Sequence, residues 1–238
     1  MYQKKFLLIV FMMVFPVLAF TQGQQGVIHY EVTTDIHRSL PEDRQELKAM
    51  IPQYNTQHYL LYFNPGKSLY QEKPQEEAAP RRGMRMMMGS PKTEIYVDRQ
   101  TRERTTFQDL MGRNYLIADT LEIIPWKFGS EQLEIADYVC MMAWYTDTVA
   151  NQEITAWFAP QLPPFMGPDR FATLPGTILA VDINNGEQVW VARDIQAREV
   201  KQDELIKPSR GEPITRAQFN LLIREQRERM NQRGGRRF

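Results

Sequence analysis

The chain is poor in the side chains that most enzymes and metalloproteins use. It has one cysteine, Cys140, and three histidines, His29, His37 and His58, among 238 residues. One cysteine cannot form an internal disulfide, and the histidines do not show the spacing of metal ligands. Cys140 lies inside an apolar strand pattern, where we expect a buried structural thiol and not a nucleophile. We therefore expect structural roles for all four side chains.

Catalytic sequence motifs are also missing. The chain contains no Gly-x-Ser-x-Gly, His-Glu-x-x-His or Cys-x-x-Cys motif and no glycine-rich phosphate loop. Four carboxylates could supply an acid/base pair, but the three aspartates lie at predicted turns, where they ordinarily cap the backbone. The sequence thus predicts no catalytic residue and no cofactor, with an envelope hydrolase as an alternative. The four are Asp147, Glu153, Asp169 and Asp182.

The chain has no excess of charge of either sign. Its 29 basic and 29 acidic residues cancel, which argues against a nucleic-acid-binding protein. Basic residues do gather in two places, where we expect solvated chain or, as the alternative, contact with an anionic membrane surface. These clusters are Arg81, Arg82, Arg85 and Lys92, and Arg229, Arg233, Arg236 and Arg237.

Long apolar runs are confined to the first residues. Lys4 and Lys5 precede an apolar run at residues 6–20, which is typical of a secretory signal peptide and short for a membrane span. We expect a signal peptide at residues 1–21, no transmembrane span after its removal, and export to the periplasm or outer membrane. Because Cys140 is far from the cleavage region, a lipoprotein is not expected.

Residues 22–238 predict a single, mainly β domain. A strand with alternating apolar residues comes first, followed by four hairpins. Asn64-Pro65-Gly66-Lys67 and Asn184-Asn185-Gly186-Glu187 are the clearest turns. Consecutive hairpins predict an antiparallel meander sheet. The first strand lies near residues 26–34, and the hairpins span residues 58–73, 93–109, 133–160 and 177–195.

The sequence predicts two helices. One short inserted helix is expected within residues 39–51, with Ser39 as its N-cap. A C-terminal helix is expected to begin at Thr215, where Gln218 completes a capping box. Residues 73–92 predict a disordered loop and residues 231–238 a flexible tail.

Two predicted strands, around Cys140 and at residues 177–183, are apolar on both faces. A large apolar side chain left in water loses about 1.5–3 kcal/mol. Both faces should therefore be covered, in a sheet curved into a half-barrel or barrel-like form, or in a sandwich of two sheets. The side chains expected to line a ligand cavity, or alternatively to fill the core, are Tyr138, Cys140, Met142, Trp144, Trp157 and Trp190.

A Leu174-Pro175-Gly176 corner precedes the second of these strands. Pro175 fixes its own φ and drives Leu174 toward an extended conformation. Gly176 is expected to take the positive φ of a type II turn. The pattern indicates an architectural corner and not a catalytic site.

The region around this corner resembles the signature region of the GLPGLI family of secreted bacterial proteins. Thr173 and Thr177 replace a Gly and a Leu of the name-giving hexapeptide, and Asp137 stands where a Gly is usual. The resemblance implies an envelope protein of Gram-negative cells with a curved antiparallel sheet, similar to the half-barrels of periplasmic lipoprotein carriers. The matching residues are Tyr138, Cys140, Ala143, Ala156, Trp157, Phe158, Pro160, Leu162, Pro163, Gly167, Pro168, Phe171, Leu174, Pro175, Gly176, Ile178 and Leu179.

Methionine is the one residue type that is unusually concentrated. Met84, Met86, Met87 and Met88 lie close together, and thioethers are soft ligands that suit Cu(I). We expect a non-enzymatic binding or accessory module that holds an apolar, lipid-like ligand or docks an outer-membrane partner. The alternatives are a copper-binding Met-rich loop and an envelope hydrolase.

Overall fold

The computed structural model describes residues 25–40, 45–74 and 92–235. Its strands are β1 (Gly26–Asp35), β2 (Tyr54–Phe63), β3 (Lys67–Glu72), β4 (Thr93–Asp98), β5 (Glu103–Leu110), β6 (Arg113–Thr120), β7 (Lys127–Ile135), β8 (Tyr138–Asp147), β9 (Gln152–Ala159), β10 (Thr177–Ile183), β11 (Gln188–Ala197) and β12 (Glu212–Ile214). The helical segments are the 3-10 turns η2 (Ile36–Ser39) and η4 (Gln202–Leu205) and the α-helices α2 (Gln45–Lys48) and α4 (Arg216–Gly235).

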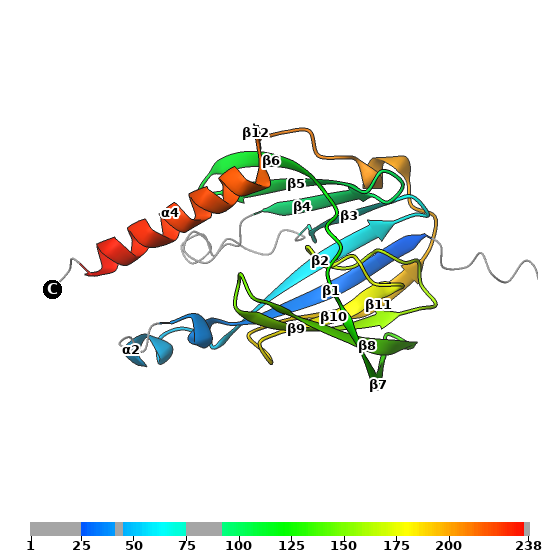
Figure 1. Cartoon of the computed structure of the whole chain (residues 1–238), viewed down its shortest axis with the longest axis horizontal. Helices are drawn as coiled ribbons and strands as arrows, with labels where there is room; N and C mark the ends of the chain where they lie inside the picture. The colour runs from blue at the N-terminus through cyan, green and yellow to red at the C-terminus, as the bar shows by residue number, and fades with distance from the viewer. Residues whose placement is uncertain (1–24, 41–44, 75–91, 236–238) are drawn as a thin grey trace, which may run out of the picture.

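All twelve strands belong to one sheet, in the order β12-β6-β5-β4-β3-β2-β1-β11-β10-β9-β8-β7 (Figure 1). Neighbouring strands run antiparallel except β12, which lies parallel to β6. The expected mainly β antiparallel sheet is therefore confirmed. The sheet is not closed, because β12 and β7 form its two edges.

The four predicted hairpins are present, and in each turn an Asn or Asp side chain accepts a hydrogen bond from a backbone N–H. Asn64 Oδ1 accepts hydrogen bonds from the N–H groups of the residues two and three positions later, at 3.0 and 2.8 Å. Asp98 and Asp147 do the same at their turns, and Asp182 Oδ1 accepts from the Gly186 N–H. The predicted turn-capping roles of Asp147 and Asp182 are thus confirmed.

The turn between β7 and β8 was missed, as was the short strand β12. The sequence suggests a single strand from residue 133 to 148, but the structure divides it into β7 and β8 at Ala136 and Asp137. These two residues have φ of 49° and 66°, the left-handed conformation of a tight hairpin turn. No glycine marks the turn in this chain.

The helical segments differ in extent from the prediction. Within the span expected for the inserted helix, the described residues form α2, and the N-cap expected at Ser39 is not tested because residues 41–44 lie outside the description. The 3-10 turn η2 ends at the first residue of this span, and Asp35 caps it by accepting from the His37 N–H. The capping box of α4 is confirmed, because the Thr215 N–H donates to Gln218 Oε1 and the Gln218 N–H donates to Thr215 Oγ1. Helix α4 continues to Gly235, into the segment expected to be a tail.

Several predictions fall outside the described residues. These are the signal peptide at residues 1–21 and nearly all of the loop at residues 73–92, with Met84, Met86, Met87 and Met88. In the described part of the chain, no helix has both the length and the apolar character needed to cross a membrane.

The main core lies on the face of the sheet that carries Ile28, Tyr30 and Val32, which we call the core face. All three side chains are buried, as the alternation predicts. Residues 160–176 cross this face and bury Met166, Phe171 and further side chains against it. The Tyr30 hydroxyl donates to the Ile178 carbonyl at 2.6 Å, which ties the first strand to β10.

The Leu-Pro-Gly corner lies at the end of this crossing segment, but the predicted reason for its glycine was wrong. Gly176 does not have a positive φ. A Cβ atom at this position would lie 2.4 Å from the carbonyl oxygen of Ala159. Glycine is therefore required by the close approach of two backbones. Leu174 is buried beside it, while Pro175 is exposed.

The other face of the sheet, which carries Glu31 and which we call the outer face, is covered only in part. The chain between β11 and β12 crosses it, with η4 in contact with β2 and β3. Farther along, the Arg210 guanidinium lies 4.3 Å from the centre of the Phe107 ring. This segment leaves the outer face of β9, β10 and β11 free for another element.

A candidate ligand-binding groove

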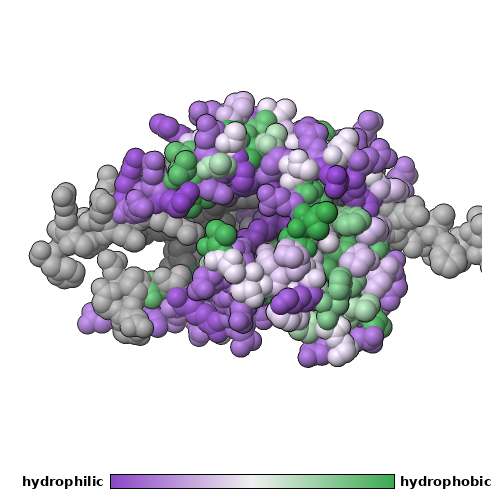
Figure 2. Space-filling view, in the orientation of Figure 1, coloured by the Kyte–Doolittle hydropathy of each residue, from purple (hydrophilic) through white to green (hydrophobic). Residues whose placement is uncertain are grey.

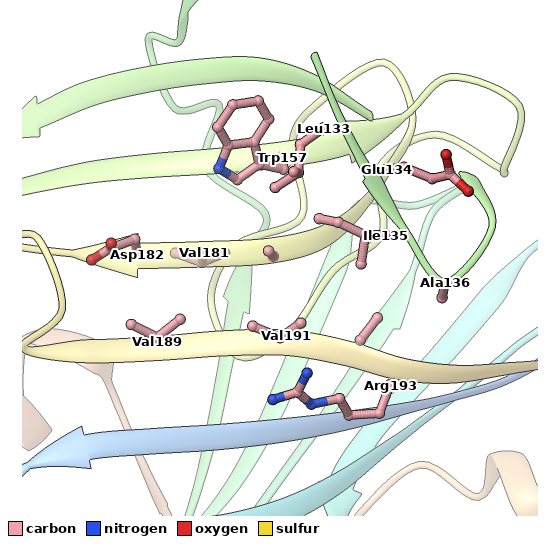
Figure 3. A pocket seen from close by; sticks show the side chains of 12 residues that line it. Leu133, Glu134, Ile135, Ala136, Trp157, Val181, Asp182, Val189, Val191 and Arg193 are labelled. Atoms are coloured by element: carbon pink, nitrogen blue, oxygen red, sulfur yellow. The ribbon is translucent and has the colours of Figure 1, made fainter. Parts of the chain in front are cut away.

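An open groove of about 440 Å³ lies on the outer face of β9, β10 and β11, beneath β7 (Figure 3). Strand β7 contacts β11, although β8, β9 and β10 separate the two strands in the sheet order. The end of the sheet therefore curls over itself. The apolar residues of its lining include Leu133, Ile135, Trp157, Ala180, Val189 and Val191.

Irregular strand pairing produces this curl. The register shifts between Phe128 and Gln132 in β7 and between Ile178 and Ala180 in β10. It shifts again in the β1–β11 pair, between His29 and Tyr30. Such bulges bend a strand and increase its twist. All three lie in the part of the sheet from β1 to β7, where they favour the curvature that brings β7 to β11.

The floor of the groove follows one row of paired residues. Trp157 lies opposite Ala180, which lies opposite Val191. A short side chain between two larger ones leaves a depression, and Leu133 and Ile135 of β7 extend over it (Figure 3). Ile135 is buried, whereas Leu133 is exposed. The groove is thus apolar and open to solvent.

The same row continues into charged residues. Glu31 lies opposite both Val191 and His58. Arg193, which also lines the groove, donates to Glu31 Oε1 from Nη2 at 2.6 Å and from Nε at 3.2 Å. The hydrogen bond from Arg193 lowers the pKa of Glu31 below its ordinary value.

Two histidines lie next to this ion pair. The His29 and His58 rings are 5.2 Å apart. Burial and the nearby Lys73 ammonium lower the pKa of His29 below 6.5, so His29 is mainly uncharged at neutral pH. Among the described residues, no group of three or more His, Cys, Asp and Glu side chains is arranged to hold a metal ion.

Of the six side chains expected to line a cavity, only Trp157 is in the lining of this groove. Tyr138, Cys140, Met142 and Trp144 alternate along β8, and Met142 is paired with Trp157, so they share the face of Trp157. The Lys127 ammonium lies 4.5 Å from the centre of the Trp144 ring. Burial raises the pKa of the Cys140 thiol to about 11, which fits the structural role expected of it.

Trp190 takes the second of the two roles expected for these side chains, that of a core residue. It lies opposite Val32 and Val181 on the core face, where it packs against Phe171 with ring centres 5.8 Å apart. Its neighbours Val189 and Val191 face the groove instead, since successive side chains of a strand point to opposite faces. Trp190 therefore fills the core.

Sequence reasoning missed most of the groove. It did not single out Val189, Val191 and Arg193, although the alternation in "QVWVARDI" places them together on the face opposite Trp190. It also missed Leu133 and Ile135, because β7 was not separated from β8. Nothing local in the sequence shows that β7 folds across the sheet.

Both faces of β8 and of β10 were expected to be covered, but only β10 is covered on both faces. Ile178, Leu179 and Ala180 are all buried. In β8, Val139 and Met141 are exposed at 47% and 37%. Figure 2 shows apolar side chains at the end of the sheet that carries β8, whereas α4 is mostly hydrophilic.

Comparison with known proteins supports the fold and part of the family resemblance. A family model described as "Protein of unknown function (Porph_ging)", the GLPGLI family, matches residues 146–180. These residues include Trp157 and the Leu-Pro-Gly corner. No sequence among curated proteins matches the chain.

Two solved structures of PNGF-II, in space groups P21 and C2, are similar in fold. Each has a TM-score of 0.57 and 16% sequence identity, and each match covers 84% of this chain. The matched region is 33% and 32% of the PNGF-II chain. This chain therefore spans about a third of the length of PNGF-II, and at this identity the similarity concerns the fold alone.

Proposed function

We propose that the protein is an exported, non-enzymatic binding module whose outer-face groove holds an apolar chain, such as the acyl chain of a lipid. The observation that carries this proposal is the open apolar groove between β7 and β9–β11, of about 440 Å³. Its volume falls within the range of about 300–1,000 Å³ that is usual for small-molecule sites. The expected periplasmic or outer-membrane location would bring the groove close to lipid.

The energetics favour an elongated apolar ligand. Burying one methylene group gains about 0.8 kcal/mol, so a chain that buries five of them gains about 4 kcal/mol before the cost of association. Trp157 and Val191 supply large apolar contacts, while the small Ala180 leaves room between them. Because the groove is open, a longer chain can extend beyond it.

The polar groups near the groove favour binding over hydrolysis. Asp182 caps the β10–β11 turn through the Gly186 N–H, and Glu31 accepts two hydrogen bonds from Arg193. The Cys140 thiol is buried, and its raised pKa keeps it protonated at neutral pH. Asp182, Glu31 and Cys140 already serve the structure, which leaves the apolar lining and the unused donors of Arg193 available to a ligand.

Filling the groove should weaken binding without leaving a cavity. Val191→Trp places a large side chain on the groove floor, so a neutral fluorescent probe, N-phenyl-1-naphthylamine, should bind about tenfold more weakly in a fluorescence titration. The matched control is Val149→Trp, because Val149 is 97% exposed in the β8–β9 turn. Equal probe binding by the unaltered protein and both variants would refute the proposal.

A further inference from the structure

We infer that the ligand of this groove carries an anionic end, which Arg193 binds. The ligand class is a single-chain amphiphile with a carboxylate next to its apolar chain. This inference rests on the proposed function, because it concerns the same groove. It adds the chemical identity of the ligand's polar end.

Arg193 lies at an irregularity in the pairing of β1 with β11. In the β1–β11 pair, Tyr30 lies opposite Ala192 and His29 lies opposite Asp194. Arg193 is thus the extra residue of a β-bulge and has no partner residue on β1. Bulges often lie next to binding sites, where they redirect a side chain. Here the Arg193 guanidinium lies beside Val191, on the side of β11 that faces β1 (Figure 3).

Arg193 has hydrogen-bond donors that Glu31 does not use. Nε and Nη2 both donate to the same oxygen, Oε1 of Glu31, and Nη1 makes no hydrogen bond within the described residues. The side chain is 54% exposed. A guanidinium has five N–H donors, so a ligand carboxylate can accept from Nη1 and the second Nη2 hydrogen while Glu31 holds the group in place.

The other charges of the groove do not offer an equivalent site. Asp182 Oδ1 accepts from the Gly186 N–H at 2.6 Å and belongs to the turn. The carboxylate of Glu134 points away from the apolar side chains (Figure 3). Arg193 is therefore the charged group that can meet the end of a chain lying over Val191. An anion there forms charge-assisted hydrogen bonds, whereas an ammonium group meets a like charge.

The test compares three ten-carbon amphiphiles that displace N-phenyl-1-naphthylamine at pH 7.5. Decanoate should bind about fivefold more tightly than decan-1-ol, and decylammonium more weakly than either. Arg193→Gln should remove the preference for decanoate. Glu31→Gln should increase decanoate affinity about twofold to fivefold, because it removes the carboxylate that competes for the guanidinium.

The matched control is Arg198→Gln, which breaks the similar Arg198–Glu204 ion pair outside the groove and should leave all three affinities unchanged. Equal binding of decanoate and decan-1-ol, or an unchanged preference in Arg193→Gln, would overturn the inference and leave the proposed function standing. Failure of every amphiphile to displace the probe, together with no effect of Val191→Trp, would refute the proposed function itself. The opposite responses of Arg193→Gln and Glu31→Gln distinguish charge recognition from loss of fold.

Discussion

Ala136 and Asp137 determine the position of β7, the strand that lies over the groove, because they turn the chain from β7 into β8. Both have left-handed backbone conformations, with φ of 49° and 66°. That conformation costs an L-residue about 1–2 kcal/mol, less for Asp, and costs glycine nothing. The chain therefore holds a strained turn beside Ile135, which lines the groove.

Asp137→Gly should stabilise the protein by about 0.5–1 kcal/mol, since glycine relieves the positive φ. The free energy of unfolding in urea measures the change. Val149→Gly is the control, because Val149 does not have a positive φ and glycine there should only add disorder to the unfolded state. A loss of stability in Asp137→Gly would show that the Asp137 side chain contributes more than its backbone costs.

At the scale of elements, the hairpins could be predicted and the curl of the sheet could not. Asn64, Asp98 and Asn184-Asn185-Gly186 mark their turns through local hydrogen bonds and backbone preferences. The alternation in β1 likewise identified Ile28, Tyr30 and Val32 as core. The groove depends instead on bulges and on contact between β7 and β11, which are far apart in the sequence. Only Trp157 was both predicted and found in the lining.

The Leu-Pro-Gly corner gives a test at this scale. Gly176→Ala should destabilise the protein by about 1–3 kcal/mol, because the new Cβ would lie 2.4 Å from the Ala159 carbonyl oxygen. Thermal and urea unfolding measure the loss. Gly66→Ala is the control, since the nearest atoms to a Cβ there are 3.9 Å away. If both variants are equally stable, the close approach does not explain the glycine.

At the scale of the whole molecule, the two faces of the sheet differ in how far they are covered. The core face is packed, whereas the outer face carries the proposed binding groove. Residues 160–176 fill the core face of one end of the sheet, and α4 packs Phe219 against Tyr115 and Ile117 of β6 at the other. Among the described residues, the chain between β11 and β12 and strand β7 are the segments that cross the outer face. The groove lies on this face between β7 and β9–β11, so the fold leaves an apolar surface available without a separate binding domain.

The attachment of α4 to the sheet should make stability depend on pH. Arg104 and Arg216 donate to Asp119 at 2.7 and 3.0 Å. Partial burial opposes ionisation of Asp119, but the hydrogen bonds and charges of the two arginines outweigh it and lower its pKa below 3.8. A carboxyl with a lowered folded pKa stabilises the protein fully above its unfolded pKa. This stabilisation is lost as the pH falls through the lower folded value.

Asp119→Asn should therefore reduce the free energy of unfolding by about 2 kcal/mol at pH 7 and flatten its dependence on pH below about 4. Urea unfolding between pH 2.5 and 7 measures both effects. Glu225→Gln is the control, because the Arg229–Glu225 pair is exposed on both sides and such pairs contribute little. If the free energy of unfolding depends on pH in the same way in Asp119→Asn and the unaltered protein, the pH dependence does not come from Asp119. Removing the carboxyl that titrates must change the slope of this dependence.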